Sequence, residues 1–196
     1  ITFNMLNSMP FTFKRLSIPD VIIAQPKSFS DDRGFFLESF KESDFVSNGI
    51  NIKFVQDNIS HSVLGVIRGL HFQKNPEAQA KLVTVIKGEI FDVVVDIRKD
   101  SPTYGKWISE TLSDKDHKLL YIPEGFAHGF CVLSKEAYVH YKVNNEYSPE
   151  HERGIIWNDP KLNIGWPISK PIVSDDDNKL PLFENLENDF VYRDTS

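Results

Sequence analysis

The chain has 196 residues, 40% hydrophobic and 26% charged, which suits one ordinary globular domain and excludes an intrinsically disordered protein. Aspartate and glutamate number 28 against 22 lysines and arginines, so the formal net charge is −6. We expect no nucleic-acid partner, because such polymers are bound by neutralising their phosphates, although a local basic pocket can still bind one small anion. No apolar run approaches the ~20 residues of a membrane helix, so no membrane partner is expected.

The only cysteine is Cys131, which permits neither an intrachain disulfide nor a multi-thiolate metal site. This usage indicates a reducing compartment and predicts a cytoplasmic location. Residues 1–8 lack the basic and apolar regions of a secretory signal. Because the chain begins with Ile1 while Met5 or Met9 resembles a natural start, we interpret residues 1–8 as a non-native leader. No linker or repeat divides the remainder, so residues 9–196 are expected to form a single domain.

Short segments rich in β-branched and aromatic residues, bounded by turn residues, dominate the chain and predict strands. In chain order they are 21–24, 53–55, 82–86, 90–97, 119–122, 130–133 and 138–143. The tight turn at Lys87 and Gly88 predicts a hairpin over 81–97. Helical periodicity is weak: residues 40–47 could form two turns and 180–186 one or two. The polar stretch after Pro167 predicts an irregular C-terminal segment lying over an all-β sandwich or barrel.

The predicted strand 90–97 has two different faces. One parity is apolar, and the other carries two carboxylates, Asp92 and Asp96, in alternation with Ile90 and Val94. The common signatures of dinucleotide binding, P-loop phosphoryl transfer, serine hydrolysis and zinc proteolysis do not occur in the sequence. We therefore expect no cofactor.

Two histidine motifs resemble the signatures of the cupin superfamily. Residues 65–77 (G-V-I-R-G-L-H-F-Q-K-N-P-E) resemble the first signature, with Gln73 in place of its second histidine. Residues 123–128 (P-E-G-F-A-H) match the core of the second. The resemblance implies a double-stranded β-helix, or jelly-roll barrel. Only His71, His128 and Glu77 remain as metal ligands where a metal cupin uses about three imidazoles and a carboxylate, so we expect no metal; a metal-dependent isomerase or oxygenase is the alternative.

An ordered series of motifs narrows the resemblance. R-G-L-H-F-Q (68–73), K-L-V (81–83), F-D-V-V-V-D-I-R (91–98), S-P-T-Y-G (101–105), I-P-E-G-F-A-H-G-F (122–130), W-N-D-P (157–160) and G-W-P (165–167) occur in this order. The series closely resembles the dTDP-4-dehydrorhamnose 3,5-epimerases, a metal-independent cupin family, from about Phe11 to Glu184. It implies epimerisation of dTDP-4-dehydro-6-deoxy-D-glucose at C3 and C5 in dTDP-L-rhamnose biosynthesis.

Epimerisation beside a ketone needs a base on one face, an acid on the other and a group that stabilises the enolate oxygen. The resemblance implies that His71 is the base, Tyr141 the proton donor and Lys81 the enolate contact. Without it, Tyr141 would be interpreted as a core aromatic and Lys81 as a solvated charge. The resemblance also implies a carboxylate that orients the base. Spacing back from Pro181 selects Asp177, with the register within 175–177 left open.

The resemblance further implies a set of substrate contacts. Arg68 and His71 have opposite strand parity, so both can reach one pocket only if the backbone bulges at Gly69. Asp176 stands where some relatives carry a lysine, which places a negative charge near the expected diphosphate. The implied substrate-binding residues are Arg33, Phe36, Glu38, Gln56, Asn58, Arg68, Lys81, His128, Tyr147 and Glu152, the first few in part across a dimer interface.

Two other functions are also compatible with the sequence. A relative that inverts only C3 or only C5 would need the same base, acid and enolate contact. A non-catalytic sugar-nucleotide-binding module would not need base and acid together. The resemblance also implies a homodimer with exchanged N-terminal strands, for which residues 11–24 are the expected contributor.

Overall fold

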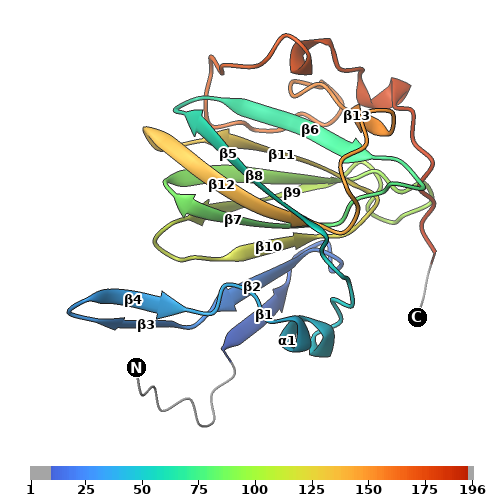
Figure 1. Ribbon diagram of the computed structural model, residues 1–196. Coiled ribbons are helices and arrows are strands. Elements are labelled where there is room, and N and C mark those ends of the chain that lie inside the picture. The colour runs from blue at the N-terminus through green and yellow to red at the C-terminus, as the bar shows by residue number, and fades with distance from the viewer. Residues whose placement is uncertain (1–9, 194–196) are drawn as a thin grey trace.

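The computed structural model describes residues 10–193, so the expected leader at 1–8 lies outside the described residues. Two antiparallel sheets face each other (Figure 1). The six-stranded sheet has the order β1 (Phe11–Arg15), β2 (Ile22–Pro26), β10 (Leu119–Ile122), β7 (Lys81–Lys87), β12 (Glu136–Val143) and β5 (Gln56–Val63). The five-stranded sheet has the order β13 (Glu152–Gly154), β6 (Ile67–Gln73), β11 (Phe126–Val132), β8 (Glu89–Asp96) and β9 (Trp107–Ser113). The predicted all-β jelly-roll class is confirmed.

Three apolar clusters hold the layers together. The first lies between the sheets and includes Val83, Val94 and Phe126. The second lies between the five-stranded sheet and the C-terminal segment, and the third lies under α1 (Glu42–Ser47) on the six-stranded sheet. The C-terminal segment contains two short 3-10 helices, η1 (Asp177–Lys179) and η2 (Phe183–Asn185), in place of the one or two turns predicted over 180–186.

The C-terminal segment also explains why neither face of β8 is exposed. Val93, Val95 and Ile97 pack under that segment, while Ile90 and Val94 point into the space between the sheets. Asp92 and Asp96, on the same side as Ile90, are fully buried. Both faces of β8 are therefore buried. One face is apolar, and the other carries two carboxylates, each hydrogen-bonded to its own partner.

The predicted hairpin over 81–97 is wrong. β7 pairs with β10 and β12, whereas β8 pairs with β9 and β11, so the turn at Lys87 and Gly88 is a corner between the two sheets. Gly88 has φ +88°, and a Cβ there would lie 2.1 Å from the carbonyl oxygen of Glu136. Only glycine fits this close approach.

Several strand boundaries differ from the predictions. Residues 53–55 are irregular, and the strand begins directly afterwards as β5, whose polar residues do not resemble a buried strand. β6 and β9 were not predicted, and β11 begins at Phe126, before the predicted 130. The strands predicted at 21–24, 82–86, 90–97, 119–122 and 138–143 and the helix within 40–47 are confirmed, with small shifts at their ends.

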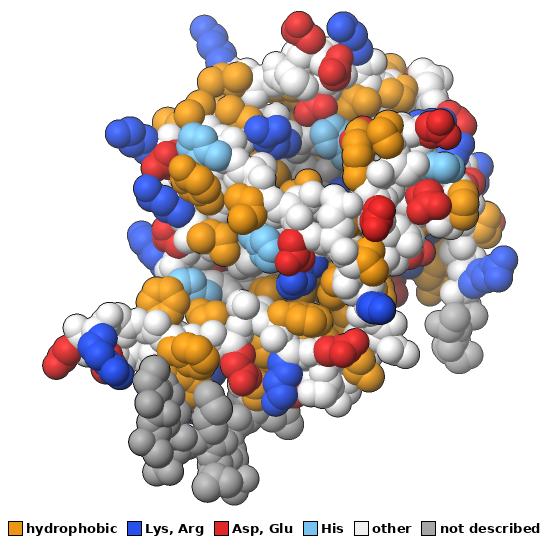
Figure 2. Space-filling view, viewed as in Figure 1, with side chains coloured by type: hydrophobic (Ala, Val, Ile, Leu, Met, Phe, Trp, Pro, Cys, Tyr) orange, Lys and Arg blue, Asp and Glu red, His pale blue; other side chains and the backbone are white. Residues whose placement is uncertain are grey.

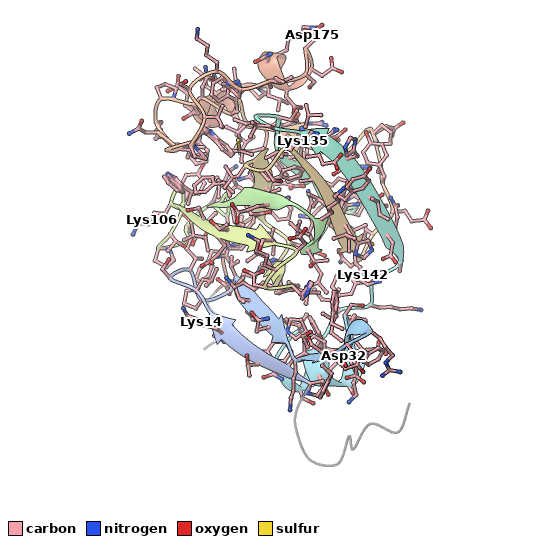
Figure 3. All side chains as sticks on the ribbon, turned by 90° about the vertical axis from the view of Figure 1, so that its left-hand side faces the viewer. Lys14, Asp32, Lys106, Lys135, Lys142 and Asp175 are labelled. Atoms are coloured by element: carbon pink, nitrogen blue, oxygen red, sulfur yellow. The ribbon has the colours of Figure 1, made fainter. Side chains whose placement is uncertain are left out.

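A separate hairpin, β3 (Ser28–Asp31) and β4 (Gly34–Leu37), projects from the body below the sheets (Figure 1). Figure 3 shows Asp32, at the turn of this hairpin, at the opposite end of the molecule from Asp175, which lies just before η1. Within residues 10–193, no helix is long and apolar enough to span a bilayer.

Candidate active site

A pocket of about 200 Å³ opens at the end of the sandwich where the C-terminal segment crosses it. Each of its walls comes from a different element: β5, β6, β7, β11, β12 and the segment around η1. The lining side chains are Ser60, Arg68, His71, Lys81, His128, Phe130, Tyr141, Ser174 and Asp177. The fold thus brings together six predicted site residues from separate parts of the sequence.

His71 and Asp177 form a hydrogen-bonded pair. The distance from His71 Nε2 to Asp177 Oδ1 is 2.7 Å, and the backbone N–H of Gly69 donates to Asp177 Oδ2 at 3.1 Å. Burial opposes ionisation of Asp177, but the bonds from His71 and Gly69 outweigh it and hold the pKa of this carboxyl below its usual value. With Asp177 accepting from Nε2–H, the neutral imidazole carries its lone pair on Nδ1. Asp175 and Asp176 are exposed, so only Asp177 makes this contact.

The expected bulge at Gly69 is present. In the β6–β11 pairing, His71 lies opposite His128 and Arg68 lies opposite Phe130. Between these two pairs, β6 therefore contains one more residue than β11. This shift brings Arg68 and His71 to one side of the sheet despite their opposite parity. Gly69 has φ +114°, and a Cβ there would lie 2.6 Å from the carbonyl oxygen of His128. The close approach of the two strands requires glycine at this position.

Lys81 lies at the start of β7, with its Nζ 3.5 Å from the carbonyl oxygen of His71. Burial lowers the pKa of the ammonium, which Glu152 and Asp92 partly restore, to about 8. The amine therefore stays mostly protonated near neutral pH and can also lose its proton in the mildly alkaline range. A lysine in this state is a strong hydrogen-bond donor to a developing oxyanion.

Tyr141 projects from β12 into the same pocket and packs against the inner core. Val139 and Val143, which share its strand parity, are fully buried. Burial raises the pKa of the phenol, while the nearby charge of Arg68 acts in the opposite direction. Tyr141 is therefore a protonated O–H at neutral pH, located in the same pocket as His71.

A second histidine–aspartate pair lies at the floor of the pocket. His128 Nε2 is 2.8 Å from Asp92 Oδ2, and Asp92 is fully buried. Burial raises the pKa of the Asp92 carboxyl, against the lowering effect of His128 and Lys81. The predicted binding residue His128 thus has a fixed ring orientation.

Four more predicted binding residues form a chain of contacts beside the pocket. The Tyr147 hydroxyl donates to Glu152 Oε2 at 2.6 Å, and the Tyr147 N–H donates to Gln56 Oε1 at 3.0 Å. Gln56 Nε2 donates to Asn58 at 2.8 Å, and Asn58 lies opposite Tyr141 in the β5–β12 ladder. Glu152 lines an adjoining hollow of about 360 Å³, together with His71 and Asp177. Tyr147 is half-exposed, so one ring face remains available to a flat ligand.

The remaining three predicted binding residues are not brought to this pocket. Arg33 lies in the turn of the projecting β3–β4 hairpin and pairs with Asp31. Phe36 lies on β4 with 44% of its surface exposed, and Glu38 follows that strand. Within one chain, these residues belong to a separate surface at the other end of the molecule (Figure 3).

Three pocket residues were not singled out from the sequence: Ser60, Phe130 and Ser174. Strand alternation could have found Ser60, because it shares a face with Gln56 and Asn58 on β5. Phe130 shares its strand face with His128 in the same way. Ser174 accepts the backbone N–H of Asp177 at 3.0 Å, a contact that no sequence pattern indicates.

The histidines do not form a metal centre in this arrangement. Among the residues that the structure describes, no three histidine, cysteine or acidic side chains converge as ligands. Gln73, which replaces the second cupin histidine, instead donates to the backbone carbonyls of Glu77 and Glu146 and accepts from the N–H of Ser148. It anchors the loop that carries Tyr147.

Comparison with known proteins agrees with this geometry. The family model described as dTDP-4-dehydrorhamnose 3,5-epimerase matches residues 15–185. A dTDP-4-dehydrorhamnose 3,5-epimerase of Shigella flexneri is 56% identical over 83% of this chain and 91% of its own length.

Solved structures of such enzymes also superimpose closely. The Bacillus anthracis epimerase with TDP and PPi bound is 48% identical, with a TM-score of 0.86 over 88% of this chain and 99% of its own. The Legionella pneumophila enzyme in complex with dTDP-4-keto-L-rhamnose is 41% identical, with a TM-score of 0.89 over 94% and 100% of the two chains. The resemblance inferred from the motifs is confirmed: this chain belongs to the dTDP-4-dehydrorhamnose 3,5-epimerase family.

Proposed function

We propose that this chain epimerises dTDP-4-dehydro-6-deoxy-D-glucose at C3 and C5 and yields dTDP-4-dehydro-L-rhamnose, in dTDP-L-rhamnose biosynthesis. One observation carries the proposal: a histidine oriented by a carboxylate, a protonated phenol and a buried ammonium line one pocket of about 200 Å³. The family to which the chain belongs supports the substrate and the reaction.

His71 is the base in this proposal. Its Nδ1 removes the proton from the carbon beside the C4 ketone, and the positive charge that develops on the imidazole is stabilised by Asp177. The C–H electron pair moves into the C3–C4 bond, and the carbonyl π pair moves onto O4. Lys81 then donates a hydrogen bond to this enolate oxygen.

Tyr141 completes the inversion by giving its phenolic proton to the opposite face of the same carbon. The phenolate regains a proton from solvent and His71 loses its proton to solvent, so no net proton is consumed. The same sequence at C5, on the other side of the ketone, gives the second inversion. None of these steps needs a cofactor or a metal ion.

The nucleotide is held partly by the lining of the reacting pocket and partly by residues beside it. The Tyr147 ring can stack on thymine, with its hydroxyl fixed by Glu152 and its loop fixed by Gln56. Arg68, oriented by the hydroxyl of Ser62 at 2.9 Å, supplies positive charge for the diphosphate, and His128 supplies a further polar contact. A local cation thus offsets the acidity of the chain as a whole.

We further propose a homodimer in which the β3–β4 hairpin of one chain completes the site of the other. Arg33, Phe36 and Glu38 lie far from their own pocket, so they can contribute to binding only through a partner. The outer face of β5, β7 and β12 carries Ile59 and Ile86, exposed by 70% and 60%. Figure 2 shows hydrophobic and histidine side chains interspersed on the face seen in Figure 1.

Exchange of N-terminal strands is a finer version of this proposal. In the structure β1 pairs with β2, and β2 pairs with β10 of the same chain. Exchange of residues 11–24 would carry β1 and β2 together and make the β2–β10 pairing between chains, at no cost in backbone hydrogen bonds. Light scattering after size-exclusion chromatography tests the dimer. A cysteine pair placed across β2 and β10, by Ile23→Cys with Leu120→Cys, tests whether the crosslink joins one chain or two.

We place the enzyme in the cytoplasm. The support is Cys131, which is buried in β11 as a free thiol, as expected for a reducing compartment.

Proton NMR of the substrate, incubated with the chain in D₂O and EDTA, tests the proposed reaction. We expect deuterium at both C3 and C5 and conversion to the L-rhamno product. Exchange at only one carbon would replace the proposal with a single-site epimerase. No exchange with EDTA, but exchange with added divalent metal, would support the metal-dependent alternative. Tight dTDP binding without exchange would indicate a binding module.

A further inference from the structure

Asp92 is a buried carboxyl group behind the pocket, hydrogen-bonded to His128, that the reaction above does not use. It lies on the inner face of β8 with no exposed surface. Its Oδ2 accepts from His128, but within residues 10–193 its Oδ1 has no hydrogen-bond partner. A carboxylate in such a place costs several kcal/mol unless nearby positive charge compensates for it. The structure should therefore contain the cations for which this charge is kept.

Two side chains that line the pocket interact with Asp92. His128, from the neighbouring strand β11, holds one oxygen. Lys81, from β7 of the opposite sheet, interacts electrostatically with it. Asp92 is therefore a buried carboxyl group that interacts both with the residue proposed to contact the enolate oxygen and with a residue proposed to contact the phosphates.

We propose that Asp92 is a positioning residue, which fixes the ring of His128 and keeps Lys81 an ammonium in the empty and the occupied pocket. It does not touch the substrate. The inference rests on the proposed function, since it assigns Asp92 a role through Lys81 and His128.

Two carboxyl groups favour the Lys81 ammonium, Glu152 more strongly than Asp92. Glu152, on β13, lies at the outer edge of the site and is bound by Tyr147, whereas Asp92 has no exposed surface. Asp177 is bound to His71 and Gly69. The titratable and charged groups that face Lys81 across the pocket are Arg68 and His71 from β6, Asp92 from β8, His128 from β11, Tyr141 from β12, Glu152 from β13 and Asp177 from η1.

Asp92→Asn keeps the shape of the side chain and removes its charge. Loss of a neighbouring opposite charge lowers the pKa of an ammonium by about 1–3 units. The alkaline limb of the kcat–pH profile, which follows the loss of the Lys81 proton, should therefore move to lower pH by at least about one unit. At pH 8, where about half of a group with a pKa near 8 is protonated, this corresponds to a loss of roughly fivefold or more in kcat. A limb that stays at the wild-type pH in a folded Asp92→Asn variant would overturn the inference.

Asp96→Asn is the matched control. Asp96 is equally buried on the same face of β8, but its partners are Arg98, Ser101 and Thr103, outside the pocket. We expect this variant to lower the melting temperature and to leave the alkaline limb unchanged. A purely structural role for both aspartates would instead make the two variants behave alike.

A measurement on the wild-type chain keeps the inference testable if Asp92→Asn does not fold. The Lys81 ammonium is titrated by NMR with labelled lysine, and Lys81→Arg identifies its signal. A pKa near 8 agrees with a local counter-charge. A pKa of about 5–6, the value of a buried lysine without one, would overturn the inference. Failure of the proposed reaction would be separate, because the wild-type chain would then show no exchange at C3 or C5.

Discussion

The active site contains two histidine–aspartate pairs that look alike and are built differently. His71 with Asp177 and His128 with Asp92 have similar distances, 2.7 and 2.8 Å. The two histidines even lie directly opposite each other on β6 and β11. The difference lies in the aspartates: Asp92 belongs to a barrel strand, whereas Asp177 arrives on the C-terminal segment.

Their surroundings push the two carboxyl pKa values in opposite directions. Asp177 is buried, but it accepts hydrogen bonds from His71 and a backbone N–H, which hold its pKa below the ordinary value despite burial. Asp92 is dry and has one donor, so burial raises its pKa. A carboxylate that orients a base must remain ionised through the reaction, and Asp177 meets this condition better. The pairs are therefore expected to respond differently to the same substitutions.

The largest expected difference is between the histidines themselves. His71→Asn removes the proposed base and should lower kcat by about 10²- to 10⁴-fold, the usual contribution of general-base catalysis. Thermal unfolding should change little, because the His71 side chain is 32% exposed. Steady-state kinetics and a melting curve measure both effects. Equal losses of kcat in His71→Asn and His128→Asn would contradict the assignment of a single base.

Asp177→Asn should come next. An amide in place of the carboxylate can bind the ring in the wrong tautomer and cannot stabilise the imidazolium, so we expect kcat to fall by about 10- to 100-fold. Asp175→Asn is the control, because Asp175 is exposed in the same acidic run and makes no contact with His71. If the control lost as much activity, the orienting carboxylate would have to be assigned again.

His128→Asn is expected to act mainly on binding. Its proposed contact with the sugar diphosphate is made in the ground state as well as in the transition state, so KM should rise by about tenfold while kcat stays within a few-fold. Calorimetric titration with dTDP gives an independent measure of the same loss. An unchanged KM with a large fall in kcat would place His128 among the reacting groups.

The smallest effects concern stability against pH. Because the folded pKa of Asp177 is lowered, its stabilisation is present above its unfolded pKa of about 3.8 and is lost as pH falls through the folded value. The gap in unfolding free energy between wild type and Asp177→Asn should therefore shrink below about pH 4. For Asp92 the sign is reversed: its raised pKa disfavours the folded state as pH rises from about 3.8 through the folded value. Urea titrations between pH 3 and 7 measure the difference in unfolding free energy between wild type and each of Asp92→Asn and Asp177→Asn. If the two differences changed with pH in the same direction, the opposite pKa shifts assigned to the two aspartates would be wrong.

Much of this site could be predicted from sequence because its motifs are local. Through the family resemblance, R-G-L-H and the Val139–Val143 stretch point to His71 and Tyr141, and the structure brings these residues into one pocket with Lys81. The register of Asp177 could not be settled among three adjacent aspartates, since only the path of the C-terminal segment decides which one meets His71.

The errors in fold prediction also have physical causes. β5 carries polar residues on the face that lines the pocket, so its pattern does not indicate a half-buried strand. A turn of two residues is equally compatible with a hairpin and with a corner between sheets, and the wrong hairpin over 81–97 follows from that ambiguity. The hairpin that carries Arg33 points away from its own site, which a single sequence cannot reveal.

If base and acid act from opposite faces of one carbon, Tyr141→Phe in D₂O should separate proton removal from inversion. His71 remains in this variant, so it should still remove the proton and return a deuteron to the same face. We expect deuterium in recovered, uninverted substrate, with dTDP binding nearly unchanged and product formation lowered by about 10²-fold or more. Product formation at the wild-type rate would show that Tyr141 is not the acid, and loss of both exchange and inversion would contradict the division of labour between His71 and Tyr141.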